Sequence, residues 1–339
     1  MSRPDGDTAP VPLPRGSARA ALMRAWHGFI RHRGIDAAAA LTFFTALASL
    51  PALLVLVSVF ALFDDRQRAN QDLAAVAGTV LPDEAAADIE RTLDELLSLQ
   101  NPVLALIAGL VLLLWTVSGY ATAFGRAVNT VYEVEEGRPF WAFRARMLLV
   151  AVALVLLTTG IIAILLGTPS AAEDIFGRRG FAPVVTTLWN WGKWPLLLAL
   201  LVAFIAVLYS ATPNVRHTRR RWASVGSLCA IGIWVLATLG FALYILIAGH
   251  YDALYGSLGG ILIALIWGYL TNAALIGGAE IDAEFVRLRQ LARGEPAEET
   301  VRLPLRDGRR NRMLARQRDA DVAASRSIRE RVEKAREKP

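Results

Sequence analysis

The sequence predicts an all-α, polytopic membrane protein with six transmembrane helices. Six long stretches contain no Lys, Arg, Asp or Glu, and all 36 basic residues lie between or beyond them. At 1.5 Å per helical residue, about 20 apolar residues span a hydrocarbon core. A backbone within lipid must satisfy its own hydrogen bonds, so each stretch is expected to be helical. In chain order these stretches are 37–63, 103–124, 147–167, 194–211, 225–249 and 257–279.

The distribution of basic residues predicts the orientation of these helices. The side that carries both termini holds 30 Lys and Arg, whereas the other side holds 6. Basic residues accumulate in cytoplasmic loops, so both termini are expected to be cytoplasmic. Anionic lipid of the inner leaflet is the partner that this charge favours, and nucleic acid is not expected.

The N-terminal region precedes the first membrane segment. Residues 1–17 are rich in Pro, Gly and Asp and are predicted to be disordered. Residues 18–35 alternate apolar residues such as Trp26 with arginines at helical spacing, which is typical of an amphipathic helix on lipid headgroups. Gly34 is expected to end this helix, and Asp36 to begin the next.

The first membrane segment contains Pro51, which removes a hydrogen bond within the helix. Two interpretations stay open, a static kink and a hinge or pocket wall. The loop at 64–102 has nine acidic residues and three arginines, and its apolar residues recur at helical spacing. We expect an extracytoplasmic helical loop there. Trp189, Trp191 and Trp194 are expected to form an aromatic belt at the outer interface.

The sixth segment carries further polar and small residues. Gly256 and Gly260 permit close helix packing. Asn272 is expected either to join helices or to lie on a pathway. An apolar stripe continues beyond Ala279, and a stop is expected at Gly294. The membrane domain is thus predicted to cover 18–293, followed by a basic and acidic cytoplasmic tail at 294–339, either a solvated helix or disordered.

Polar motifs follow the second, fourth and sixth segments on the cytoplasmic side. Glu280 and Glu284 lie four residues apart, where like charges repel, and acidic groups are unfavourable near a helix C-terminus. They are therefore expected to meet cations on the same side, namely Arg126, Arg138, Arg216 and Arg287. The hypothesis is a single cluster that joins the three motifs. The candidate gate, substrate or coupling residues are Asn129, Glu136, Arg138, Asn214, Glu280, Glu284 and Asn272.

Catalytic and metal-binding signatures are not found in the sequence. The four histidines do not occur at the spacing of a metal-binding helix, and there is no nucleophile elbow or phosphate-binding loop. His250, Asp252 and Ser257 share one short turn, so a catalytic triad is not expected. No metal, no cofactor and no enzyme activity are therefore predicted.

Several motifs resemble the YihY/BrkB family of bacterial inner-membrane proteins over about residues 20–290. They comprise 38–51 (AAALTFFTALASLP), Ser118–Gly119, Ala127–Asn129 with Tyr132, Glu136 with Arg138, Pro213–Asn214, 255–259 (YGSLG) and 278–284 (GAEIDAE). Asp282 departs from the family, which often has Asn there. The resemblance implies six membrane helices and links to envelope lipid handling. It also brings the labels ribonuclease BN and virulence factor; the nuclease label finds no metal-ligand cluster here.

Three classes of function follow from these observations. The leading expectation is a transporter or translocator of a lipid or another anionic envelope component, with Asn129, Asn214 and Glu280 as a gate or coupling site. The alternative is a membrane scaffold that uses its basic tail, and an enzyme is the least favoured. Small residues in the fifth and sixth segments permit a homo-oligomer without requiring one.

Overall fold

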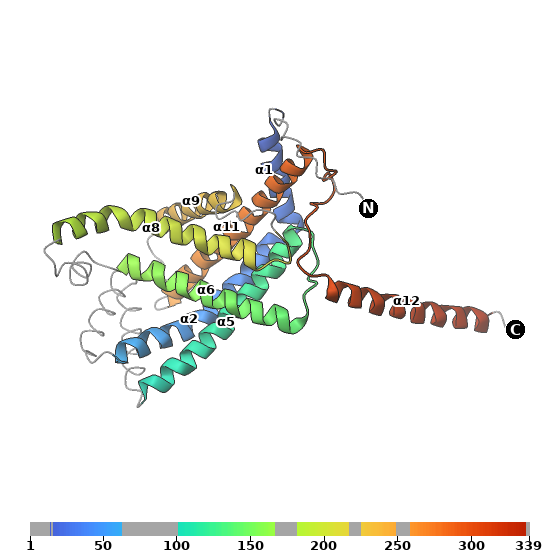
Figure 1. Ribbon diagram of the computed structural model, residues 1–339, viewed down its shortest axis with the longest axis horizontal. Coiled ribbons are helices and arrows are strands. Elements are labelled where there is room, and N and C mark those ends of the chain that lie inside the picture. The colour runs from blue at the N-terminus through green and yellow to red at the C-terminus, as the bar shows by residue number, and fades with distance from the viewer. Residues whose placement is uncertain are drawn as a thin grey trace.

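The computed structural model describes residues 14, 16–62, 101–166, 182–216, 225–248 and 258–336. Within these ranges the chain is helical, apart from turns, irregular segments between helices, and one isolated bridge between Val215 and Leu305. The helices, shown in Figure 1, are α1 (Ser17–Arg31), α2 (Gly34–Leu62), α5 (Pro102–Val131), α6 (Phe140–Leu166), α8 (Ala182–Ala211), α9 (Val225–Ala248), α11 (Leu258–Leu291) and α12 (Arg309–Arg336).

Six of the described helices are long and apolar enough to cross a membrane, which confirms the predicted fold class. The spans are Gly34–Val59, Pro102–Val131, Phe140–Leu165, Trp191–Ala211, Val225–Ile247 and Gly259–Leu291. Large apolar side chains on these helices are exposed, as expected for surfaces that face lipid. Several helices extend beyond the uncharged stretches, because polar residues at their ends are covered by neighbouring segments.

Helix α11 holds the bundle together, since it contacts α9, α2, α1 and α5. On the other side of α5, α6 packs between α5 and α8. Helix α1 and the first turns of α12 lie at the same end of the bundle, and we call this end the terminal face (Figure 1). The buried core is concentrated near this face, around residues such as Phe124, Tyr132 and Met147.

Helix α1 packs against α11 through small residues, and its large apolar side chains remain exposed. Ala21, Ala25 and Gly28 are buried, whereas Leu22 and Trp26 are 48% and 61% exposed. In Figure 1, α1 lies across the end of the bundle rather than along it. This arrangement fits an interfacial helix.

The expectation that Gly34 ends α1 is wrong. The helix ends at Arg31, Arg33 adopts the left-handed conformation with φ 56°, and Gly34 is the first residue of α2. A Cβ at Gly34 would lie 2.4 Å from the ring of Phe29, so the glycine is required by the tight corner. The expectation that Asp36 begins the next helix is also wrong, because α2 starts at Gly34 and Asp36 lies within its first turn. Asp36 pairs with Arg33 at 3.3 Å.

Pro51 lies inside α2, which continues from Gly34 to Leu62. The hydroxyl of the nearby Ser49 donates to the carbonyl of Ala46 at 2.7 Å and not to the carbonyl of Leu47 that proline leaves without its usual partner. Pro51 does not line the groove described below.

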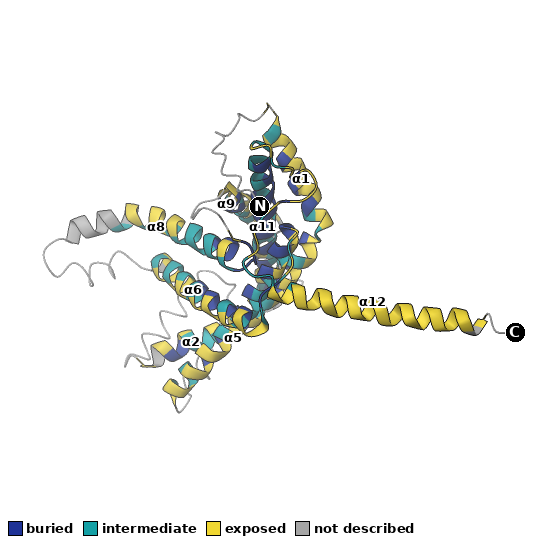
Figure 2. Cartoon of the chain, turned by 45° about the vertical axis from the view of Figure 1, so that its right-hand side comes forward, coloured by how far each residue is buried: buried dark blue, intermediate teal, exposed yellow. Residues whose placement is uncertain are grey.

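The tail has two parts. Helix α11 ends at Leu291, and Gly294 follows with φ 73°, as the sequence predicts. The chain then returns across the terminal face, where Arg216 and Arg306 make backbone hydrogen bonds to Pro304 and Asn214. From Arg309 it forms α12, which projects from the bundle and is exposed along its length (Figure 2).

Some expectations fall outside the described residues. These are the extracytoplasmic helical loop within 64–100, Gly256 of the G-x-x-x-G pair, and the disorder of residues 1–13. Ser17 already belongs to α1. Of the expected aromatic belt, Trp191 and Trp194 are exposed, and the ammonium group of Lys193 lies 5.4 Å from the Trp194 ring.

The backbones of α9 and α11 approach closely at two glycines. A Cβ at Gly278 would lie 2.4 Å from the Cβ of Ala230 and 2.8 Å from the carbonyl oxygen of Gly226. A Cβ at Gly226 would lie 2.5 Å from the carbonyl oxygen of Gly278. Small residues allow this close packing. In lipid the hydrophobic effect does not drive helices together, so van der Waals contact of this kind stabilises their association.

We predict that Gly278→Ala lowers the free energy of unfolding by about 1–3 kcal/mol, because the added methyl group overpacks the contact between α9 and α11. Gly277→Ala is the matched control, since a Cβ there meets nothing within 4 Å. Unfolding of the purified protein in detergent measures both. Equal stability of the two variants would contradict the assigned packing.

Candidate functional site

Polar side chains from α5, α8, α11, α1 and the tail meet at the terminal face. The structure brings together Asn129, Glu136, Arg138 and Asn214 in one hydrogen-bonded group, which we call the asparagine network. Glu280 and Glu284 lie in a second group where α1 crosses α11. Asn272 lies apart from both groups, within the span of α11.

Asn214 is the centre of the asparagine network and is fully buried. Its backbone N–H donates to Oδ1 of Asn129 at 2.8 Å. Its side-chain amide donates to the carbonyls of Glu135 and Asp307, at 3.1 and 2.8 Å, and its Oδ1 accepts from the N–H of Asp307 at 3.2 Å. One side chain thus joins the ends of α5 and α8 to the returning tail.

Arg138 and Glu136 form a bidentate ion pair beside this amide. Nε and Nη2 of Arg138 lie 2.7 and 2.6 Å from the two carboxylate oxygens of Glu136. Nη2 also donates to the carbonyl of Thr212 at 2.7 Å. Glu136 in turn accepts from Nδ2 of Asn129 at 3.1 Å. Arg138 is only 5% exposed, so the loss of either charge would leave its partner buried and unpaired.

The acidic residues of α11 meet basic side chains that come mainly from α1 and its C-terminal cap. Nδ1 of His32 lies 2.8 Å from Glu280, which is 3% exposed. Arg24 and Arg287 each lie 3.2 Å from Glu284. Of the four arginines expected at these acids, only Arg287 takes that place.

The remaining three arginines have other partners or surroundings. Arg138 pairs with Glu136, Arg216 donates to the carbonyl of Arg306 at 3.4 Å, and Arg126 lines a groove. The physical reason is that α1 covers the acidic face of α11. Arg24, Gly28 and His32 are spaced four residues apart, so they lie on one face of α1 and its cap. A small residue between two polar ones allows another helix to approach closely and to pair with both, so this spacing could have indicated the contact.

Asp282 joins three helices at the same end of the bundle. Its Oδ2 accepts from the hydroxyl of Tyr132 at 3.0 Å, and its Oδ1 accepts from the N–H of Gly226 in the first turn of α9 at 3.4 Å. Burial and the nearby carboxylate of Asp282 raise the pKa of Tyr132 well above its usual range. Asp282 therefore lies near the N-terminus of α9, where an acidic side chain is favourable.

Asn272 uses its hydrogen-bonding groups between helices. Its Oδ1 accepts from the hydroxyl of Tyr120 on α5 at 2.9 Å. Its Nδ2 donates to Thr42 on α2 at 3.2 Å and to the carbonyl of Gly268 at 3.0 Å. Of the two interpretations left open by the sequence, this geometry favours the joining of helices.

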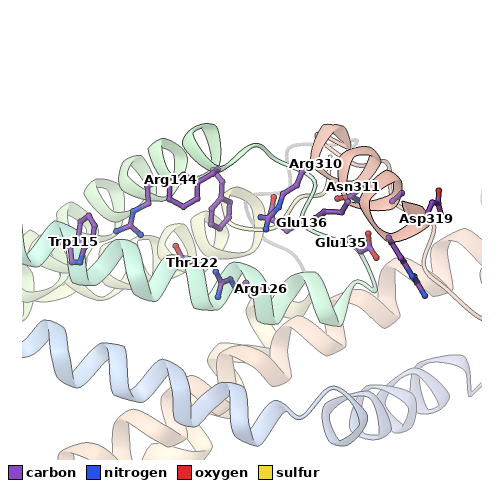
Figure 3. Close-up of a pocket in the computed structure, with 14 residues that line it drawn as sticks. Trp115, Thr122, Arg126, Glu135, Glu136, Arg144, Arg310, Asn311 and Asp319 are labelled. Atoms are coloured by element: carbon purple, nitrogen blue, oxygen red, sulfur yellow. The ribbon is translucent and has the colours of Figure 1, made fainter. Parts of the chain in front are cut away.

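A groove of about 1090 Å³ runs between α5, α6 and the first turns of α12 (Figure 3). The guanidinium of Arg144 lies 4.2 Å from the ring centroid of Trp115, a residue near the middle of α5. The groove combines this stacked cation with apolar side chains. The lining residues are Trp115, Thr122, Arg126, Glu135, Glu136, Phe140, Phe143, Arg144, Arg310, Asn311, Leu314, Ala315, Arg318 and Asp319.

The sequence did not point to Arg144 as a candidate, because nothing in its spacing to Trp115 shows that α6 packs beside α5. Glu136 is the residue shared by the asparagine network and the groove. The network therefore lies next to this groove.

Comparison with known proteins identifies the family. The family model for virulence factor BrkB matches residues 25–304, which is most of the chain. This protein belongs to the BrkB family. The match includes the last part of α1, all six described spans and most of the returning part of the tail, and it ends before α12. No solved structure matches the chain.

Curated relatives of this BrkB-family protein carry different kinds of names. The putative ribonuclease-like protein YfkH of Bacillus subtilis is 29% identical over 277 residues, covering 78% of this chain and 94% of YfkH. A UPF0761 membrane protein of Rhodospirillum centenum is 28% identical over 280 residues, covering 79% of this chain and 57% of the relative. The UPF0761 membrane protein YihY of Shigella sonnei is 32% identical over 179 residues, covering 51% of this chain and 58% of YihY.

We predict that Asn214→Ala lowers the free energy of unfolding by about 2–4 kcal/mol, because it leaves several buried backbone groups without partners. Asn311→Ala is the matched control, since Oδ1 of Asn311 has no hydrogen-bond partner in the described part of the chain. That control is expected to change stability by less than about 0.5 kcal/mol. If thermal unfolding in detergent shows equal losses for both variants, Asn214 does not hold the terminal face together.

Proposed function

We propose that this protein transports or translocates a lipid or another anionic amphiphile of the envelope across the bacterial cytoplasmic membrane. The observation that supports this most directly is the groove between α5, α6 and α12. An amphiphile needs a polar path for its headgroup beside an apolar surface for its chains, and this groove has both. Arg144 and Arg126 supply positive charge, and Trp115, Phe140 and Phe143 supply apolar contact.

Arg144 suits an anionic headgroup because its charge is not neutralised by a carboxylate. Among the described residues it stacks on Trp115, and no ion pair is formed by its side chain. Stacking holds the guanidinium in one orientation while its N–H groups remain free for a ligand. An arginine of this kind binds phosphate or carboxylate through two parallel hydrogen bonds.

The asparagine network is the proposed gate. Asn129, Asn214, Glu136 and Arg138 close the terminal face beside the groove. The pair of His32 and Glu280 is the proposed coupling site, since it is buried and joins an imidazole to a carboxylate, the kinds of side chain that form proton relays. A passing substrate would have to separate segments that these hydrogen bonds hold together.

We predict that Arg144→Gln slows the movement of fluorescent phosphatidylglycerol across liposomes at least about tenfold, because the variant loses a charge-assisted contact with the headgroup. Wild-type protein reconstituted at the same density sets the reference. A wild-type rate equal to that of protein-free liposomes would contradict the proposed function. A variant rate equal to wild type would contradict the role of Arg144.

Arg326→Gln is the matched control for this measurement, since Arg326 is exposed on α12 and does not line the groove.

A scaffold is the second candidate function, and the exposure of α12 favours it. Truncation after Asp319 removes the part of α12 that does not line the groove. A transporter keeps its flux after this truncation, whereas a scaffold loses its partners and shows no flux in either form.

We propose further that the terminal face is cytoplasmic. The excess of basic residues on the side of both termini supports this orientation, as does the position of α1 and α12 at one end of the bundle (Figure 1).

The orientation predicts how single cysteines react with a membrane-impermeant maleimide in intact spheroplasts. The one natural cysteine, Cys229, is first replaced by Ser. Ser98→Cys in the acidic loop is expected to react, whereas Ser327→Cys on α12 reacts only after permeabilisation. The reverse pattern would overturn the orientation.

A further inference from the structure

The C-terminus of α8 is surrounded by arginines. Helix α8 ends at Ala211, and its last carbonyls have no partner within the helix. Arg146 Nε donates to the carbonyl of Ala211 at 2.9 Å, and Arg138 Nη2 donates to that of Thr212 at 2.7 Å. Arg306 Nη2 donates to the carbonyl of Ser210. Three cations from α6, the loop before it and the tail thus converge on one helix end.

The positive charge at this helix end exceeds what the cap requires. A helix C-terminus carries about half a negative charge, and Glu136 supplies one more through Arg138. Arg216 adds a fourth guanidinium, because its Nη2 donates to the carbonyl of Arg306. The nearby Asp307 does not compensate this charge, since it pairs with Arg309 at 2.7 Å.

The electrostatics of Arg306 reflect this excess. Its burial and its three arginine neighbours, Arg146, Arg138 and Arg216, lower the pKa of Arg306 to about 10. A guanidinium with a carboxylate partner is shifted in the opposite direction, as Asp307 raises the pKa of Arg309. The positive charge of these arginines is therefore not balanced by the carboxylates beside them.

Two donors of the cluster are buried and have no acceptor. Nη1 of Arg138 and Nη1 of Arg306 are both without a hydrogen-bond partner in the described part of the chain. Arg138 is 5% exposed, so water does not readily replace the missing acceptor. Buried donors of this kind are rare in native proteins and are costly unless a ligand fills the site.

We propose that Arg138, Arg146 and Arg306 bind a phosphate group at the C-terminus of α8. A phosphate offers several oxygen acceptors and matches the planar fork of a guanidinium. Arg306 and Arg146 are half-buried and Ser210 is exposed, so the edge of the site reaches the surface while the two unpaired donors lie beneath it. The phosphate comes either from a phospholipid headgroup or from a soluble phosphate ester.

This site differs from the groove that supports the proposed function. Arg146 faces α8, whereas Arg144, two residues earlier on α6, faces Trp115 of α5. The phosphate site rests on the unsatisfied donors at α8 and not on the transport proposal. Binding here can therefore be present in a protein that shows no flux, and absent in one that does.

The test measures the unfolding temperature of the full-length protein in nonionic detergent as a function of added ligand. The ligands are inorganic phosphate, glycerol 3-phosphate and phosphatidylglycerol, each compared with potassium chloride at the same ionic strength. Wild type and the control Arg326→Gln are expected to be stabilised. Arg306→Gln and Arg146→Gln are expected to weaken the apparent Kd at least about tenfold, because each loses charge-assisted hydrogen bonds.

The ligands distinguish the two sources of phosphate. Stabilisation by inorganic phosphate or glycerol 3-phosphate supports the site with a soluble ester, and stabilisation by phosphatidylglycerol alone supports it with a lipid. The absence of stabilisation by all three would overturn the proposal, as would equal stabilisation of wild type and Arg146→Gln. Arg306→Lys keeps the charge, so it is expected to bind with intermediate affinity and guards against a folding defect in Arg306→Gln.

Discussion

The hydrogen bonds of one buried amide, that of Asn214, hold the terminal face of this protein together. Where a helix leaves the membrane, its last carbonyls need partners, and water is excluded when other segments cover them. At the end of α8 three arginines donate to these carbonyls. Asn214 joins the segments that cover this end, because it bonds to Asn129, Glu135 and Asp307 at once.

Helix α11 is joined to its neighbours at this end of the bundle by charged side chains. Asp282 faces α5 and α9, Glu280 faces α1, and Glu284 faces Arg24 and Arg287. The two glutamates would repel each other if they had no partners. Glu280 is paired with His32, and Glu284 is paired with Arg24 and Arg287. The charges of α11 thus select its neighbours, while its glycines set how closely α9 can approach.

The sequence was sufficient for the six spans, because uncharged stretches of this length have only one stable form in lipid. It also indicated Asn129, Asn214, Glu280 and Arg138 as groups that need partners at one end of the bundle. It could not supply those partners. His32 meets Glu280 across 248 residues, and the stack of Arg144 on Trp115 depends on how α6 packs beside α5.

Local reasoning failed at the corner between α1 and α2. A glycine near a helix end suggests a left-handed cap, yet Arg33 adopts that conformation and Gly34 makes room for Phe29. The position of the phenyl ring is set by tertiary packing, which no local pattern contains. The surplus of arginines at α8 was hidden for the same reason, since Arg138, Arg146 and Arg306 come from separate segments.

The contact of α1 with α11 has a consequence for the order of biosynthesis. The ribosome makes His32 long before Glu280, and a Cβ at Gly28 would come within 2.6 Å of that carboxylate, so the fit between the two helices is close. The N-terminal helix can therefore take up its final contact only after the last span, α11, has been made.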